Sequence, residues 1–319
     1  MTTAPAQRYE FAPPPAPKRA SSWYASKIKP RIALGGPPDA TRLTVAWVLA
    51  ALSLCTLWFV FFATVMSSLQ EAHNQHNAYA AFREQLTQLA PQTAPLGGII
   101  TPDSPVALIN APSIGLKDVV VIEGTASGDL ARGPGHRRDT PLPGQAGVAL
   151  IYGRANLFGG AFGRVPQAKP GDLITVATGQ GESKYKVEDV RHVGDPFPVS
   201  LADGDGQLTL VTSEGGTWLN GWMPKWPVYL DAKLQGQAFP TPSGRLGSVP
   251  KAENSMKGDI GALFPLVLWL PVLILAAIAA VWLQDRWGRW HTWLAGAPVI
   301  LAALWGVSET AAQLLPNLM

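Results

Sequence analysis

The chain has 319 residues, an apolar share of 47%, a mean hydropathy of +0.12 and a formal net charge of +3. That apolar share is too high for an ordinary soluble protein, so the apolar residues must gather in a few long segments. The basic excess lies mainly in the first forty residues, where it fits contact with an inner membrane leaflet and gives no reason to expect nucleic-acid binding. The single cysteine, Cys55, excludes an intramolecular disulfide.

Residues 1–42 form a Pro-rich, basic segment that cannot bury a core, and we expect a disordered cytoplasmic tail. Residues 43–66 carry no charge and are long enough to cross a bilayer core of about 30 Å as a helix. Basic residues resist translocation, so the tail should stay inside and residues 67–100, a helical stalk and linker, should lie outside.

The sequence pattern changes at residue 101. From there to residue 234, short β-rich runs are separated by Gly, Pro, Asp and Asn. Seven or eight such strands predict one closed β-barrel or a sandwich. The clearest runs are Val106–Ile109, Val119–Ile122, Val148–Tyr152, Leu173–Ala177, Tyr185–His192, Leu208–Thr212 and Val228–Leu234.

The last third of the chain returns to the membrane. Residues 235–260 are polar and rich in Gly, Pro and Ser, which predicts a linker, and residues 261–283 are again uncharged and predict a second span. Residues 284–291 carry Arg286 and Arg289 and should form a cytoplasmic loop. Residues 292–315 predict a third span. A buried or interfacial helix is the alternative, because the segment contains Glu309, two glycines and a proline.

The β-rich region also carries a series of motifs in a recognisable order. They are Ile114-Gly115-Leu116, Gly133-Pro134-Gly135-His136, Leu142-Pro143-Gly144-Gln145, Ile151-Tyr152-Gly153, Lys169-Pro170-Gly171-Asp172 and Leu208-Thr209-Leu210-Val211-Thr212. This series resembles the sortase family, especially its class E, actinobacterial type. The resemblance implies a membrane-anchored, mainly β protein: a closed barrel of about eight strands, here flanked by two or three transmembrane helices.

Sortases are transpeptidases that cut an LPxTG-type sorting signal through a thioester on a cysteine. At the position of that cysteine this chain has Ser213, and at the position of the family's histidine it has Arg154. Lys225 stands where the family has an arginine, so only a positive charge is retained. The resemblance therefore implies a degenerate triad.

The chemistry of these replacements argues against catalysis. A serine hydroxyl is unreactive until a positioned base removes its proton. Arg154 cannot be that base, because an arginine side chain has a pKa above about 12. We therefore expect no catalytic residues in a pseudo-sortase that acts as a binding or scaffolding subunit of a cell-envelope complex. The alternative is a transpeptidase or hydrolase that uses Ser213 with Lys225 as base; a purely structural subunit is a third reading.

Candidate binding residues lie near the former catalytic positions. Trp218, Trp222 and Trp226 recur at four-residue spacing, and they form either a recognition surface or ordinary packing. His136 follows the Gly-Pro-Gly turn, where a packing hydrogen bond is the expected role. The expected partners are membrane or cell-envelope proteins, a peptide in the former cleft and the lipid bilayer. No cofactor and no metal are expected, since the loop acids Asp195, Asp203 and Asp205 are better explained by solvation.

Overall fold

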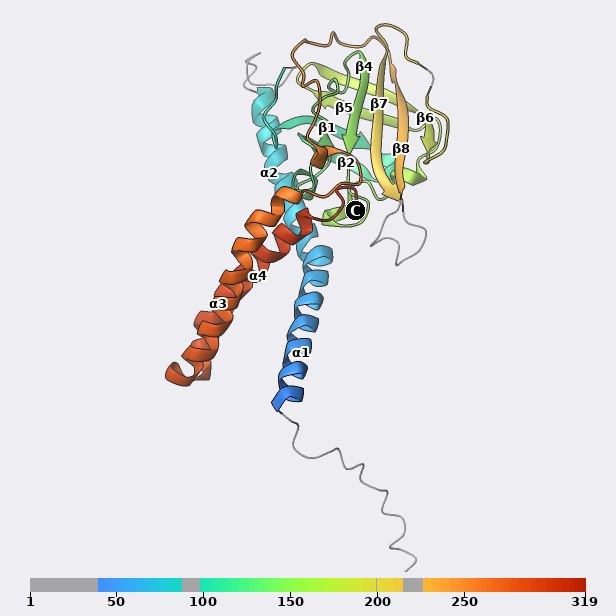
Figure 1. Cartoon of the computed structure of the whole chain (residues 1–319). Coiled ribbons are helices and arrows are strands. Elements are labelled where there is room, and N and C mark those ends of the chain that lie inside the picture. The colour runs from blue at the N-terminus through green and yellow to red at the C-terminus, as the bar shows by residue number, and fades with distance from the viewer. Residues whose placement is uncertain (1–39, 88–97, 199, 215–225) are drawn as a thin grey trace, which may run out of the picture. The chain divides into compact units, whose positions relative to one another are not determined.

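The computed structural model describes residues 40–87, 98–198, 200–214 and 226–319 (Figure 1). The chain divides into two compact units, Met1–Ser53 and Leu54–Met319. Most of the expected tail (residues 1–39) lies outside the described residues, as do Trp218, Trp222 and Lys225. In the first unit the described part is the beginning of helix α1, Ala40–Phe61, whose side chains up to Ser53 are all exposed.

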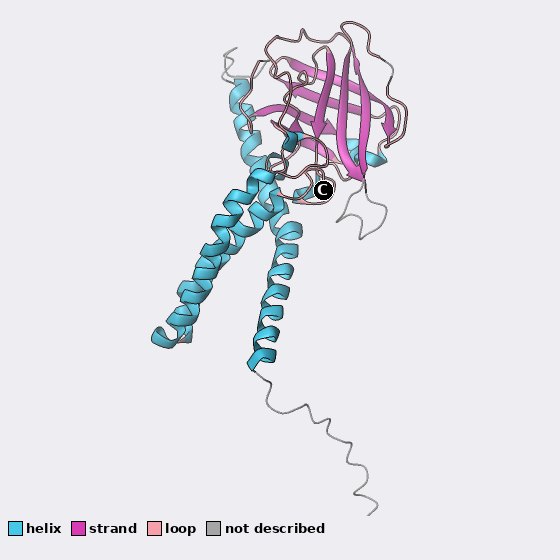
Figure 2. Ribbon diagram, in the orientation of Figure 1, coloured by secondary structure: helices cyan, strands magenta, loops and turns pink. Residues whose placement is uncertain are grey.

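The second unit contains a closed barrel of eight strands, coloured magenta in Figure 2. Neighbouring strands follow the order β1-β2-β3-β4-β7-β8-β6-β5. The pairs β2 with β3 and β4 with β7 are parallel, and the other pairs are antiparallel. The strands are β1 Pro105–Ala111, β2 Leu116–Glu123, β3 Gly135–His136, β4 Gly147–Tyr152, β5 Leu173–Thr178, β6 Gly181–Arg191, β7 Gly206–Glu214 and β8 Trp226–Gln235. The closed barrel is therefore confirmed, and the sandwich is not formed.

The barrel core is made by inward-facing aliphatic residues together with Phe162 and Tyr185, both with 0% of their surface exposed. Strand β7 is buried at every position except its last, Glu214, as expected for a strand with neighbours on both sides and cover on both faces. Phe162 packs directly on Gly153, where an added Cβ would lie 2.4 Å from the ring. Gly153 therefore permits the close approach that seals this end of the core.

Among the described residues, three helices are long and apolar enough to cross a membrane, judged by length and composition. The first runs through α1, a π-helical turn η2 (Phe62–Met66) and α2 (Ser67–Thr87); the others are α3 (Leu263–Trp287) and α4 (Arg289–Gln313). Helices α3 and α4 lie side by side in Figure 1 and contact each other extensively. Only Gly288, at φ +81°, separates them, so the turn is much shorter than the expected loop 284–291. A glycine adopts that backbone conformation without strain.

The π-helical turn brings Phe62 into contact with two other parts of the second unit. Its ring centroid lies 6.4 Å from that of Phe158, in the short helix η5 (Phe158–Gly160), and 5.1 Å from that of Trp305 in α4. Both pairs are edge-to-face, the arrangement that aromatic rings favour. A single-turn π-helix commonly marks a place where a helix is adapted to a packing or functional need.

The segment expected to be a linker, residues 235–260, packs against the barrel through polar anchors. The Arg245 guanidinium contacts the buried Glu123 of β2 at 2.6 Å, and Arg138 pairs with Glu253. The backbone N–H of Phe239 donates to the carbonyl of Gly144 at 2.8 Å. The polar composition of residues 235–260 does not predict these contacts with the barrel, because ionic and main-chain contacts leave no hydrophobic pattern in the sequence.

Candidate functional site

Arg154 and Ser213 lie at the same edge of the barrel because of the parallel pairing of β4 and β7. Tyr152 is the register partner of Val211, and the N–H of Gly153 donates to the carbonyl of Val211 at 2.9 Å. Arg154 therefore lies two residues after Tyr152, and Ser213 lies two residues after Val211, so the two residues occupy matching positions on neighbouring strands. The resemblance predicts that these positions belong to one site, and the strand register puts them at one edge.

The hydroxyl of Ser213 is engaged with main chain. Ser213 is 3% exposed, and its Oγ donates a hydrogen bond to the carbonyl oxygen of Leu318 at 2.5 Å. The same oxygen accepts the N–H of Ala155 at 3.1 Å. In the part of the chain that the structure describes, no imidazole or carboxylate hydrogen-bonds to Ser213.

Arg154 is buried without a carboxylate partner among the described residues. Its Nη2 donates to the carbonyl oxygen of Ser127 at 2.7 Å and to the Ser127 hydroxyl at 2.8 Å, while Nε and Nη1 find no acceptor there. The guanidinium lies 4.6 Å from the ring centroid of Phe158, a cation–π arrangement. Burial lowers the pKa of Arg154 to about 9, so the group still carries its charge at neutral pH. Arg154 is thus a fixed cation that cannot accept a proton there.

Residues 314–319, which follow α4 and which we call the closing segment, fill this edge of the barrel. Asn317 and Leu318 are 0% exposed and Met319 is 7% exposed. The Leu318 side chain packs with Leu130, Tyr152 and Val211, and Met319 joins the cluster around Phe62 and Phe158. In Figure 1 the label C marks this end of the chain beside the barrel.

Ser127 connects Arg154 to the closing segment. Its hydroxyl is 3.1 Å from the carbonyl oxygen of Leu315 and 3.4 Å from that of Ala312, and its backbone carbonyl accepts from Arg154. A small cavity of about 20 Å³ beside the guanidinium is lined by Ser127, Arg154 and Glu309, among others. Both family positions are therefore tied, directly or through one residue, to the segment after α4.

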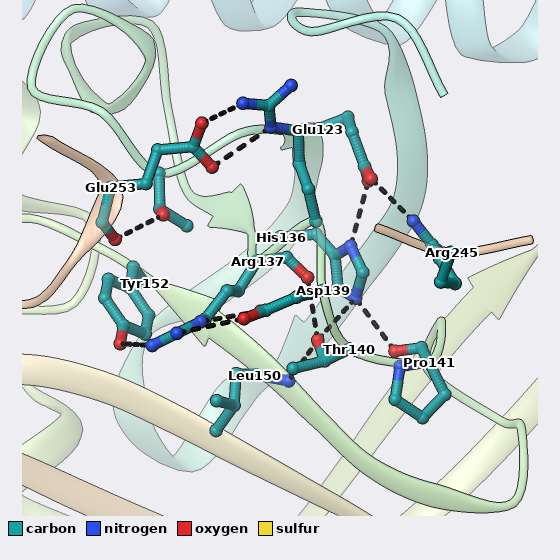
Figure 3. Close-up of polar contacts among 12 residues, drawn as sticks. Glu123, His136, Arg137, Asp139, Thr140, Pro141, Leu150, Tyr152, Arg245 and Glu253 are labelled. Carbon is teal, nitrogen blue, oxygen red and sulfur yellow. Dashed lines mark hydrogen bonds and ion pairs between the residues drawn. The ribbon is translucent and has the colours of Figure 1, made fainter. Parts of the chain in front are cut away.

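His136 lies in a separate buried network, drawn in Figure 3. Its Nδ1 is 2.9 Å from the carboxylate of Glu123, and its Nε2 is 2.8 Å from the carbonyl oxygen of Pro141. Glu123 also receives Arg245, and both Glu123 and His136 have 0% of their surface exposed. The ring is held on both nitrogens by protein acceptors, which fits the packing role expected for His136.

The remaining candidates divide between the outer surface and undescribed residues. Trp226 begins β8 opposite Glu214 and is 60% exposed. His192 pairs with Glu214 at 3.0 Å, and both side chains are about half exposed, so neither faces the buried Ser213. Lys225, Trp218 and Trp222 lie outside the described residues, so the Ser213–Lys225 hypothesis has no geometry to examine.

No sequence pattern predicts the closing segment. The pattern of residues 292–315 was explained by a span, and residues 316–319 follow it with no motif of their own. The available signal is Asn317, a polar residue between apolar neighbours directly after a long apolar run. The partners of Asn317 are carbonyl groups sixty or more residues away, which no local pattern reveals.

Together, the closed eight-stranded barrel and the three described helices of membrane-spanning length define a membrane-associated protein that carries a β-barrel domain beside its apolar helices. Residues 109–216 match the family model described as Sortase domain. This part of the barrel is therefore similar to a sortase domain, in agreement with the motif order.

Solved sortase structures resemble this chain at low identity. A Clostridium perfringens sortase D transpeptidase is 21% identical with a TM-score of 0.41, covering 51% of this chain and 99% of that one. A sortase E mutant from Streptomyces avermitilis is 23% identical with a TM-score of 0.36, covering 49% and 100%. Sortase A from Corynebacterium diphtheriae is 17% identical with a TM-score of 0.37, covering 54% and 93%. None of the curated proteins matches the chain.

Proposed function

We propose that this protein is a non-catalytic sortase-like membrane protein, a binding or scaffolding subunit of a cell-envelope complex. One observation carries the proposal: the Ser213 hydroxyl is used as a hydrogen-bond donor to the carbonyl of Leu318. A nucleophilic serine must instead pass its proton to a base. Arg154, at the position of the family's base, is a buried cation and cannot take it.

The membrane orientation is part of the proposal. The basic residues of the tail and those beside the turn at Gly288, Arg286 and Arg289, favour the cytoplasmic side. The barrel follows the first long apolar helix and precedes the second, so this arrangement puts it outside the cytoplasm. The expected partners are other membrane or cell-envelope proteins.

An aromatic surface offers a place for such a partner. Trp226 and Phe197 are 60% and 89% exposed, and Arg191 lies 5.8 Å from the Phe197 ring centroid and 5.1 Å from that of Tyr229. Exposed aromatic side chains with an arginine are the residue types that contribute most at protein interfaces. The proposed partner therefore contacts the barrel near Trp226.

The closing segment adds a second line of support for binding. It contains Leu315-Pro316, the dipeptide that also opens the LPxTG-type signal implied by the family resemblance. Ser213 and Ser127 hold this segment through hydrogen bonds to main-chain carbonyl oxygens, without a covalent bond.

A serine transpeptidase is the second candidate function, and one observation favours it. The N–H of Ala155 donates to a carbonyl oxygen that lies beside the Ser213 hydroxyl, and a backbone donor in this place can stabilise the oxyanion of acyl transfer. This candidate needs a base, for which Lys225 is the hypothesis.

The test uses the full-length protein, purified gently in detergent through a tag. Intact-mass measurement after incubation with a fluorescence-quenched LPxTG peptide should show neither cleavage nor an acyl group on the protein, and Ser213→Ala should behave identically. Mass spectrometry of the co-purified material should give a defined set of membrane partners in fixed ratio. An acyl adduct that disappears in Ser213→Ala would replace the proposal by the serine transpeptidase.

A further inference from the structure

Glu309 is an unusual residue in an apolar helix. It is the one acidic residue of α4, it is half-buried, and it lies four positions before the end of the helix. A carboxylate in an apolar helix is costly, so such residues face a partner or a water-filled space inside the protein. The partner of Glu309 should therefore be a group of opposite charge near this end of α4.

Arg154 is the buried cation that shares a cavity with Glu309. The cavity of about 20 Å³ is also lined by Gln70 of α2, so the barrel and two helices contribute to it. A buried water molecule needs about 10–15 Å³ of such space and two to four polar partners. The cavity can therefore hold one water molecule and little more.

The polar atoms around this cavity include both donors and acceptors. Within the described part of the chain, Arg154 Nε and Nη1 have no acceptor, and Gln70 Oε1 has no donor. The other atom of that amide, Gln70 Nε2, donates to Glu309 Oε1 at 3.4 Å. A halide ion only accepts hydrogen bonds, and a metal cation would face the guanidinium, so neither fits this mixed lining. Water fits it because it both accepts and donates.

From this lining we infer that the cavity binds one water molecule, which accepts a hydrogen bond from Arg154 and donates to Gln70 and Glu309. Glu309 is then the counter-ion of Arg154 across a single water molecule. The site joins α2, α4 and the barrel, and it holds the guanidinium in place, so Glu309 is a positioning residue. This inference goes beyond the proposed function and is independent of whether the barrel reacts or only binds.

The two charged groups depend on each other to different degrees. A hydrogen bond through an ordered water is nearly as favourable in enthalpy as a direct one, so the pair is coupled without touching. One water molecule takes only one of the two free donors of Arg154, and the guanidinium stays incompletely hydrogen-bonded. Glu309 is half-buried and can regain hydration when Arg154 is replaced. Removal of Glu309 should therefore destabilise the protein only while Arg154 is present.

A double-mutant cycle on the full-length protein in detergent measures this coupling. Glu309→Gln keeps the shape of the side chain and should lower the unfolding temperature by about 2–4 °C. In the Arg154→Met background the same change should lower it by less than about 1 °C. The control is Glu182→Gln, an exposed carboxylate of β6 that does not line this cavity, and its effect should be the same in both backgrounds.

A second measurement identifies the occupant and needs no variant, so it decides the question even if a variant fails to fold. A crystallographic map of the full-length protein at about 2 Å resolution should show one peak within about 3.2 Å of an Arg154 nitrogen and of a Gln70 or Glu309 oxygen. Crystals grown with bromide in place of chloride should show no anomalous signal at this peak.

Three results would overturn the inference. An equal loss of unfolding temperature from Glu309→Gln in both backgrounds would mean that Glu309 does not act through Arg154. Direct contact between the carboxylate and the guanidinium, with no peak between them, would make the pair an ordinary ion pair without water. An anomalous bromide signal would make the occupant an anion.

Discussion

The hydroxyl of Ser213 lies 2.5 Å from the carbonyl oxygen of Leu318, a residue 105 positions later in the chain. This contact joins the end of strand β7 to the segment that follows α4. The hydrogen bond helps to hold the second unit together. The consequences are measurable as stability as well as binding.

Ser213→Ala should lower the free energy of unfolding by about 1 kcal/mol, the usual net contribution of one hydrogen bond. The loss is limited because the N–H of Ala155 still donates to the Leu318 carbonyl. Thermal unfolding of the full-length protein in detergent, followed by tryptophan fluorescence, measures the change. The exposed Ser248→Ala should leave the transition where it is; an equal loss in both variants would contradict a specific role for Ser213.

Replacement of Arg154 by an uncharged side chain of similar size should not lower the free energy of unfolding, in contrast to Ser213→Ala. Nε and Nη1 are buried without acceptors among the described residues. The guanidinium has therefore lost its hydration without gaining enough hydrogen bonds to offset the cost. Arg154→Met fills similar space without charge, and should leave the free energy of unfolding unchanged or raise it by about 1 kcal/mol or more.

Arg154→Ala is the matched comparison. It removes the same charge but leaves a cavity beside Phe158, so it should destabilise by about 2–4 kcal/mol. Urea unfolding curves of the two variants separate charge from volume. Destabilisation by Arg154→Met as large as that by Arg154→Ala would mean that the charge itself stabilises the fold through contacts with Ser127.

Much of the barrel is predictable because its strands repeat apolar, β-branched residues at the period of a pleated sheet. Each of the seven predicted runs overlaps one observed strand. The eighth, β3, has only Gly135 and His136, and two residues cannot show a period. Its existence depends on the parallel neighbour β2, which is a property of the assembled barrel.

The site was predictable only in part. Motif order locates Arg154 and Ser213, and the register of β4 with β7 then brings the strand ends together. The hydrogen-bond partners of Ser213 and Arg154 could not be predicted in this way, because they are the main-chain carbonyl oxygens of Leu318 and Ser127. Every residue has such a group, so no side-chain pattern could single out these two.

The buried Glu123 contacts both His136 and Arg245, and these contacts should be among the strongest polar anchors of the barrel. Glu123→Gln removes the charge that the Arg245 guanidinium faces and that lies beside His136, in a place with 0% exposure, and should cost about 3–5 kcal/mol. The control is Glu182→Gln in the exposed pair with Lys184, which should change stability by less than about 1 kcal/mol. Urea unfolding of both variants measures the difference. Equal, small effects would show that the network is dispensable.

Asp129 should make stability depend on pH in the acidic range. Its Oδ2 accepts the N–H of Ala126 at 3.1 Å, and desolvation by burial, with a smaller contribution from Glu253, raises the pKa of its carboxyl group to about 6. The folded state therefore binds this proton more tightly than the unfolded state, whose carboxyl group has a pKa near 4. Stability due to this group should be greatest below about pH 4 and should fall by about 1–2 kcal/mol as the pH rises through 6. Asp129→Asn keeps an oxygen acceptor and cannot ionise, so its unfolding temperature, relative to that of the unaltered protein, should rise between pH 4 and pH 7. A difference between the two proteins that stays constant over this range would rule out titration of Asp129.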